Sequence, residues 1–136
     1  MATDISTDVF NGLPTTNGMF STVQGTDFTA RKRVFNAVTN SKRLRDMVSK
    51  PVTISDIVVQ TTDYTDERGE VTRRPRTILI TPDGEAYGTT SVAVLRTVQN
   101  LISLLGMPHE WPEPLTVVPQ MVRGSKGLEF MQLSLA

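Results

Sequence analysis

One segment of the chain has the pattern of an amphipathic α-helix, and its place among strand-like segments limits the possible folds. In residues 91–105, the apolar side chains of Val94, Val98, Leu101 and Leu105 recur three or four positions apart, which is the spacing of one helix face. Gly106 at its end is typical of a helix terminus. Short segments that are rich in β-branched or alternating apolar residues occupy 52–60, 72–81, 85–90, 115–122 and 128–135. We therefore predict a mainly β protein of the order β-β-β-α-β-β.

Five strands with one helix between the third and the fourth is the order of the oligonucleotide/oligosaccharide-binding (OB) fold, a five-stranded barrel. The alternation of residues 52–60 changes phase at Ser55, which predicts a bulge in a long first strand. Pro75 and Pro119 predict unpaired edges or bulges in the second and fourth strands. We expect a polar loop at 61–71 and a hairpin turn at 124–127. Phe35 and Phe130 fit core-facing positions, and we expect Trp111 to be a structural plug.

The N-terminal part of the chain has a different character. Residues 1–27 are rich in Ser, Thr, Asn and Gly, so we predict an extended or mobile arm whose isolated Phe10, Phe20 and Val23 dock on the domain or on a partner. The remaining residues, 28–136, would form one OB-like nucleic-acid-binding domain. A short helix is predicted to begin near Asp27 or Thr29, and a further helical turn or two is predicted at 44–48, before Pro51.

The composition excludes several classes of active site. The chain has 136 residues and contains no Cys and only one His, which excludes thiolate metal sites and cysteine nucleophiles and leaves little room for a Ser-His-Asp triad. The acids of residues 63–70 lack the spacing of a calcium loop. We therefore expect no enzyme, no metal and no cofactor. No apolar run approaches the length of about 20 residues that spans a membrane, and the polar N-terminus does not have the pattern of a secretory signal.

The net charge of zero conceals a segregation of charge along the chain. Residues 31–50 carry seven bases and one acid, whereas residues 51–70 carry one base and five acids. Clustered cations of this kind favour contacts with phosphates, and aromatic side chains beside them can stack on bases. A solvated helix face, or a partner for the acidic loop, is the alternative for the basic block, and a half-buried barrel position is the alternative for Tyr87. The candidate nucleic-acid-binding residues are Arg31, Arg33, Lys42, Arg43, Tyr64, Arg73, Arg74, Arg76, Tyr87, Arg123 and Lys126.

Three stretches together resemble a known family. They are residues 33–60, which include the run PVTISDIVVQ, the run ILITPDGEAY at 78–87, and the helix end NLISLLGMP at 100–108. Over about residues 31–135 the chain is similar to the small single-stranded DNA-binding proteins of bacteriophages that infect Gram-positive hosts. The resemblance implies an OB-like barrel that coats single-stranded DNA without sequence preference during phage replication or recombination, in the host cytoplasm. It carries base stacking to Tyr87 and DNA contact to the basic strand at 73–76.

The sequence also departs from many single-strand binders, which end in an acidic tail that recruits partners. This chain ends in QLSLA, so recruitment of replication proteins, or self-association along the strand, would fall to the acidic segment 1–30. Two alternatives remain open at this level. One is a phage structural or adaptor protein that self-assembles, and the other is an RNA-binding OB module.

Overall fold

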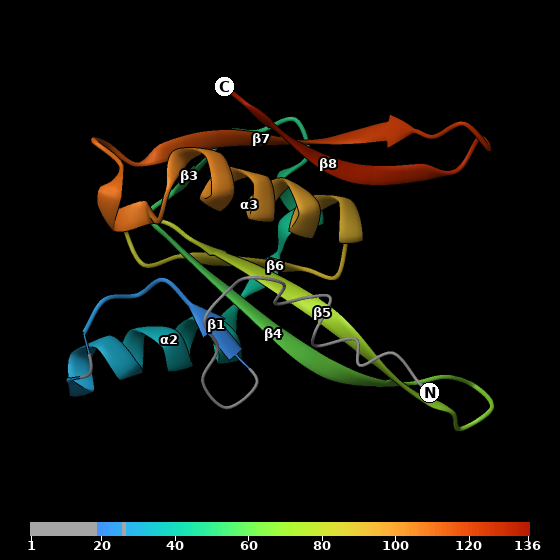
Figure 1. Cartoon of the computed structure of the whole chain (residues 1–136). Helices are drawn as coiled ribbons and strands as arrows, with labels where there is room; N and C mark the ends of the chain where they lie inside the picture. Colours follow the sequence, from blue (N-terminus) through green and yellow to red (C-terminus); the bar gives the residue numbers. More distant parts are fainter. Residues whose placement is uncertain (1–18, 26) are drawn as a thin grey trace.

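The computed structural model describes residues 19–25 and 27–136, which form a mainly β structure with two sheets and two α-helices (Figure 1). The larger sheet has the strand order β1 (Met19–Ser21), β4 (Asp56–Thr65), β5 (Val71–Ile80), β6 (Ala86–Thr89) and β2 (Lys42–Arg43). The smaller sheet has the order β3 (Val52–Ile54), β7 (Leu115–Arg123) and β8 (Glu129–Leu135). The helices are α2 (Phe28–Asn40) and α3 (Val92–Leu105), with short 3-10 turns η1 (Leu44–Met47) and η2 (Pro108–Glu110).

The phase change at Ser55 predicted a bulge, and the structure has a change of sheet there instead. Residues 52–54 pair with β7 in the smaller sheet, and from Asp56 onward the same segment pairs with β5 in the larger one. At the switch, the Ser55 backbone N–H donates to the carbonyl oxygen of Ile80 at 2.8 Å. One continuous segment, 52–65, therefore joins the two sheets and brings their inner faces together.

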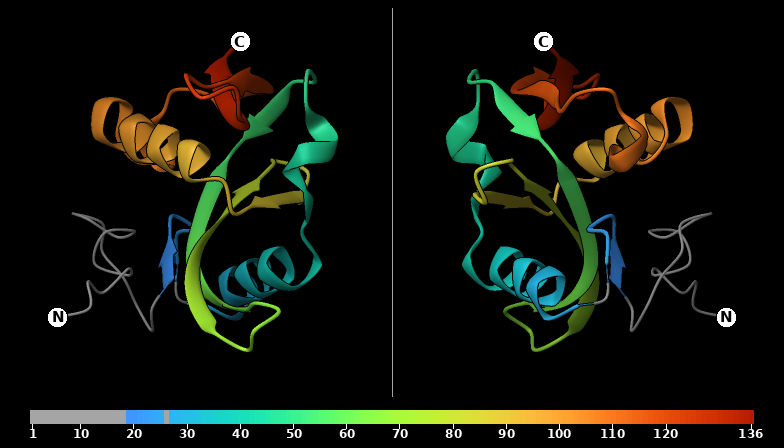
Figure 2. Two further views of the ribbon diagram at one scale, coloured as in Figure 1. Left: turned by 90° about the vertical axis from the view of Figure 1, so that its right-hand side faces the viewer. Right: turned by 90° about the vertical axis from the view of Figure 1, so that its left-hand side faces the viewer.

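The larger sheet is covered on both faces, with α2 and α3 on opposite sides of β4 and β5 (Figure 2). Successive strand residues point to opposite faces. Ile57 and Leu79 therefore pack toward α3 and the smaller sheet, whereas Val58 and Ile78 pack with Ala37 of α2. Burial on both faces explains why these strand segments are continuous apolar runs.

The helix ends that the sequence predicts are confirmed. Asp27 is the N-cap of α2, and its side chain accepts from the backbone N–H of Ala30 at 2.9 Å. Ser91 caps α3 in the same way, accepting from Val94 at 3.2 Å. Such caps satisfy backbone donors that have no partner within the helix. Gly106 follows α3 with a φ of 86°, in the left-handed region that glycine tolerates.

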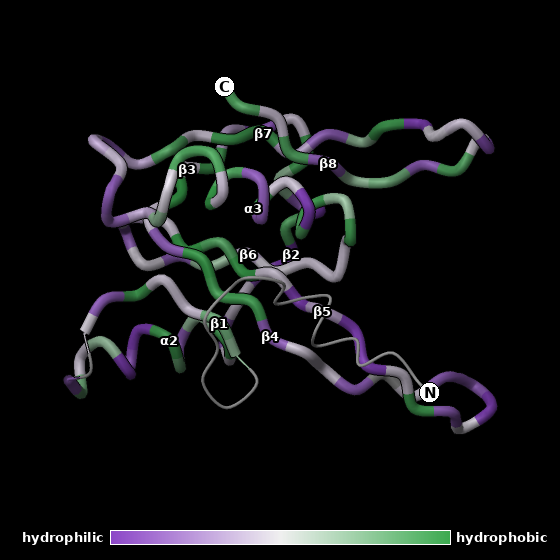
Figure 3. Tube along the Cα trace, viewed as in Figure 1, coloured by the Kyte–Doolittle hydropathy of each residue, from purple (hydrophilic) through white to green (hydrophobic). Residues whose placement is uncertain are grey.

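The expected loop at 61–71 is wrong, because most of it is strand. The β4–β5 ladder runs from the pair Asp56 and Ile80 out to the pair Thr65 and Val71. Only residues 66–70 form the turn, where the Asp66 carboxylate accepts from the backbone N–H groups of Arg68 and Glu70, each at 2.9 Å. The outer half of this hairpin projects beyond the core and is largely hydrophilic (Figure 3), which is why its sequence has the composition of a loop.

Part of the predicted arm belongs to the larger sheet. Strand β1 pairs antiparallel with β4, and Phe20 is completely buried in the main core. The expectation that Phe20 docks on the domain is confirmed, whereas Phe10 lies outside the described residues. Five strands were expected, and the described residues contain eight, because β1 and the two-residue β2 were missed and the first strand divides into β3 and β4.

Two aromatic residues are not in the core, contrary to expectation. Phe35 is 65% exposed, because Ala37 and the half-buried residues Val34 and Val38 occupy the sheet-facing side of α2. Phe130 is 39% exposed, because alternation in β8 turns Met131 and Leu133 inward instead. Trp111 is half-buried against the main core, and its Nε1–H donates to the carbonyl oxygen of Gly106 at 2.9 Å, which confirms a structural role.

Candidate nucleic-acid interface

A basic groove lies beside the C-terminal end of α2, where the chain enters β2. Strand β2 pairs in parallel with β6, which sets Lys42 opposite Tyr87 and Arg43 opposite Gly88. Four cations line the groove, and none of the described lining residues is acidic. We call it the basic groove, and its lining residues are Ser41, Lys42, Arg43, Arg45, Arg76, Gly88, Thr89 and Thr90.

Arg76 forms the wall of the basic groove and also attaches α2 to the sheet. Its guanidinium donates to the carbonyl oxygen of Val38 at 3.2 Å and to the Ser41 hydroxyl. Gly88 leaves the space for it, since a Cβ there would lie 3.1 Å from Arg76 Nε and 3.3 Å from Ser41 Oγ. The position of Arg76 is therefore determined by groups on α2, β5 and β6 together.

Two cations of the basic groove form ion pairs at its rim. Lys42 Nζ lies 2.8 Å from Glu85, and Arg43 lies 3.2 Å from Asp46. The hydrogen bond to Glu85, with its negative charge, raises the pKa of Lys42 above its ordinary value, so this side chain is charged at neutral pH. All four side chains are largely solvent-exposed, and exposed ion pairs of this kind contribute little to stability. A phosphate can therefore replace the carboxylates at little cost.

Four of the other predicted cations lie on two hairpins. Arg73 and Arg74 lie on β5 in the outer part of the β4–β5 hairpin, and Arg73 lies 3.6 Å from Asp63. Arg123 and Lys126 lie at the tip of the β7–β8 hairpin, where Arg123 is 4.0 Å from Glu129. Both hairpins project from the same side of the molecule (Figure 1). Together they form two hairpin arms with the core between them. The turn of the β4–β5 arm also carries three acids, Asp66, Glu67 and Glu70.

The two predicted tyrosines lie in different settings. Tyr64 lies in β4 opposite Thr72, and its side chain is outside the part of the structure that is described. Tyr87 lies opposite Leu79 and packs against the main core, with half-burial. The half-burial that the alternative interpretation of Tyr87 expected is therefore present.

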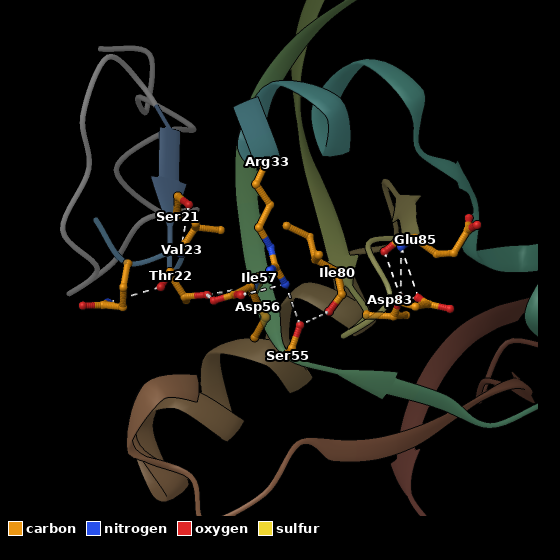
Figure 4. Close-up of polar contacts among 12 residues, drawn as sticks. Ser21, Thr22, Val23, Arg33, Ser55, Asp56, Ile57, Ile80, Asp83 and Glu85 are labelled. Atoms are coloured by element: carbon orange, nitrogen blue, oxygen red, sulfur yellow. Dashed lines mark hydrogen bonds and ion pairs between the residues drawn. The ribbon is translucent and has the colours of Figure 1, made fainter. Parts of the chain in front are cut away.

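The two predicted arginines of α2, Arg31 and Arg33, also lie in different settings. Arg33 turns toward β4, where it lies 3.2 Å from Asp56 and donates to the Ser55 hydroxyl at 3.0 Å (Figure 4). Asp56 also accepts from the Thr22 hydroxyl at 3.0 Å, so this network joins α2, β4 and the segment after β1. Arg31 is exposed on the solvent face of α2. The structure therefore brings Lys42, Arg43 and Arg76 into one groove and leaves Arg31 and Arg33 on other surfaces.

Sequence reasoning missed several residues of this region. Arg45 completes the basic groove. It belongs to the basic block at 31–45, for which phosphate contact was expected, although Arg45 was not among the individual candidate residues. Thr89 and Thr90 also line the groove, but nothing in their local sequence indicates it, because only the β2–β6 pairing brings them there.

Two further findings concern the described residues. They contain no cluster of three or more His, Asp or Glu side chains that could hold a metal ion. None of the helices described is long and apolar enough to span a membrane.

Comparison with known proteins identifies one family. The family model for phage single-stranded DNA-binding protein matches residues 14–136. Searches among curated proteins and among solved structures found no significant match. The family match covers both sheets, both α-helices and the basic groove, and the chain therefore belongs to the family of phage single-stranded DNA-binding proteins.

Proposed function

We propose that this single-stranded DNA-binding protein holds the DNA backbone in the basic groove. The observation that carries this proposal is the convergence of Lys42, Arg43, Arg45 and Arg76 on one concave surface whose described lining has no acidic side chain. Single-stranded DNA binders use such positively charged grooves to follow the phosphates. Because phosphate contacts do not read base edges, binding is expected to show little sequence preference.

We propose that the two hairpin arms extend the contact surface. Arg73 and Arg74 on one arm and Arg123 and Lys126 on the other add cations on one side of the molecule. Tyr64 would add a stacking surface on the first arm. In this proposal Arg76 both lines the basic groove and stabilises the domain, whereas Arg33 stabilises the domain without contacting the DNA, because both connect α2 to the larger sheet.

We infer that the two sheets form a partly open OB-type barrel. The segment 52–65 acts as the shared first strand, and the pairings β4–β5, β5–β6 and β7–β8 follow, with α3 between the third and fourth strands of the barrel. In the described residues no ladder joins β6 to β8, so the barrel is open at that edge. The division into an arm at 1–27 and a binding domain at 28–136 is kept as a proposal, with β1 contributing to the domain's sheet.

We propose further that the protein coats and protects single-stranded DNA during phage replication or recombination, in the host cytoplasm and without catalysis. Self-association along the strand and contact with replication proteins belong to the same proposal. The family match supports the DNA-binding role, and no observation favours the structural-protein or RNA-binding alternatives.

The test is fluorescence anisotropy with labelled oligo(dT) of increasing length, with duplex DNA and oligo(U) of equal length as competitors. We expect tight binding that neither competitor displaces efficiently, and an affinity that reaches a plateau at the length of the site. Arg45→Gln should weaken binding, whereas Arg96→Gln, an exposed arginine on α3, should not. Equal loss in both variants would show that the basic groove is not the binding site, and efficient competition by oligo(U) would favour RNA as the ligand.

A further inference from the structure

The solvent-facing side of α2 carries two exposed aromatic rings with two cations between them. Phe28 is 68% exposed and Phe35 is 65% exposed. Arg31 and Lys32 lie between them, at the i+3 and i+4 positions from Phe28, so all four side chains share one helix face. We call this set, Phe28, Arg31, Lys32 and Phe35, the α2 stripe.

Packing does not account for the two rings. The sheet-facing side of α2 is occupied by Ala37, which is buried, and by the half-buried Val34 and Val38. The rings lie on the opposite side of the helix and are largely exposed, so core packing does not account for them. The ammonium group of Lys32 lies 5.1 Å from the centre of the Phe28 ring, so cation and ring already form one contact surface.

The charged side chains of the α2 stripe are all positive, and the stripe runs along the helix axis. Residues 28–40 contain no Asp or Glu. Phe28 and Phe35 are seven residues apart, which separates them by about 10 Å along the helix axis, or about three stacked base steps. The C-terminal end of α2 leads through Ser41 into the basic groove, so the helix that carries the stripe ends at the groove.

We propose that the α2 stripe is a second single-stranded DNA contact surface, on which Phe28 and Phe35 stack with bases and Arg31 and Lys32 contact the phosphates between them. The inference rests on the proposed function, because it extends the path of the DNA from the basic groove along α2. Exposed rings interleaved with cations match the two requirements of single strands, base stacking and charge neutralisation.

A second copy of the chain is a poorer occupant for the same surface. In a two-fold contact each stripe would face the identical stripe, and Arg31 and Lys32 would approach their counterparts. Like charges brought together in this way oppose association, whereas a polyanion neutralises them. Charge complementarity therefore selects the nucleic acid.

The experiment compares the full-length double variant Phe28→Ala/Phe35→Ala with the wild type on two labelled oligomers of equal length, oligo(dT) and an abasic oligomer with the same phosphates. We expect the Kd for oligo(dT) to rise about tenfold or more, since each lost stacking contact weakens binding several-fold, and the Kd for the abasic oligomer to change little. Phe28→Tyr/Phe35→Tyr should retain the wild-type affinity. Leu104→Ala, which removes an apolar side chain that is 81% exposed on α3, is the matched control.

Each outcome decides between the possibilities. An unchanged Kd for oligo(dT) in the double variant would overturn the α2 stripe while leaving the basic groove intact, provided that Arg45→Gln still weakens binding. An equal loss on both oligomers would overturn base stacking. A lower mass of the double variant in light scattering without DNA would identify the stripe as an interface between copies, which also overturns the inference. Failure of the wild type to bind oligo(dT) would instead refute the proposed function itself.

Discussion

The charge of the basic groove predicts how strongly the affinity for DNA depends on salt. We consider the triple variant Lys42→Gln/Arg43→Gln/Arg45→Gln, which removes three exposed cations and leaves Arg76, with its bonds to α2, in place. Each phosphate contact with a single strand contributes about −0.7 to the slope of log K against log salt concentration. Three contacts therefore contribute about −2, which corresponds to about 20-fold in affinity between 50 and 200 mM salt.

The assay is anisotropy with labelled oligo(dT) at four or more salt concentrations across this range. We expect the slope of the triple variant to be shallower than that of the wild type by about 2, whereas Arg96→Gln, which removes one exposed cation outside the groove, should leave the slope unchanged. Comparison of thermal unfolding for all variants verifies that the fold is intact. Equal slopes for the triple variant and the wild type would refute the reasoning, because the removed cations would then release no counterions on binding.

Three further predictions concern the framework that supports this surface. Phe20→Ala should lower the free energy of unfolding by about 3–5 kcal/mol, measured by urea denaturation, since the ring is completely buried; a change below about 1 kcal/mol would show that β1 is not part of the stable core. Arg33→Gln should cost about 1 kcal/mol of stability, because Asp56 loses its ion pair, yet leave the Kd for oligo(dT) nearly unchanged; a weakened Kd at unchanged stability would assign Arg33 to the DNA instead. The Thr81 hydroxyl, followed by the backbone N–H of Glu85, lowers the pKa of Asp83 below 3.8, so its contribution to stability is present above that pH and is lost as the pH falls through the lower folded value. The stability difference between the wild type and Asp83→Ala should therefore persist at neutral pH and vanish in acid, and a difference that is independent of pH would contradict this assignment.

The helices and most strands could be predicted from local patterns. Asp27, Ser91 and Gly106 mark helix ends because capping depends on residues adjacent in sequence. The β4–β5 hairpin was only half recognised, since its outer part is stabilised by cross-strand pairing and has polar side chains on both faces. The burial of Phe20 was left open, because it depends on a partner strand that lies 37 to 41 residues further along the chain.

The candidate site, like the fold, could be predicted from the sequence only in part. The basic block identified Lys42 and Arg43 as phosphate-binding candidates, since clustered charge is visible in the sequence. The sequence did not indicate that Arg76 joins them, because only the packing of α2 on β5 brings its guanidinium to Ser41. Nor did it place Phe35 on the surface, because helical periodicity defines faces without saying which of them the sheet will cover.

By itself, the sequence determined the mainly β character, the order of the principal elements and the family, because these depend on patterns along the chain. The tertiary structure decided which residues share a surface. Long-range contacts produce the switch of sheets at Ser55, the parallel pairing of β2 with β6 and the packing of α2 on the larger sheet. Their stability comes from burial and hydrogen bonds between distant segments. These contacts bring Arg76 to the three cations of the basic block in one groove and turn the two phenylalanines of α2 toward the solvent.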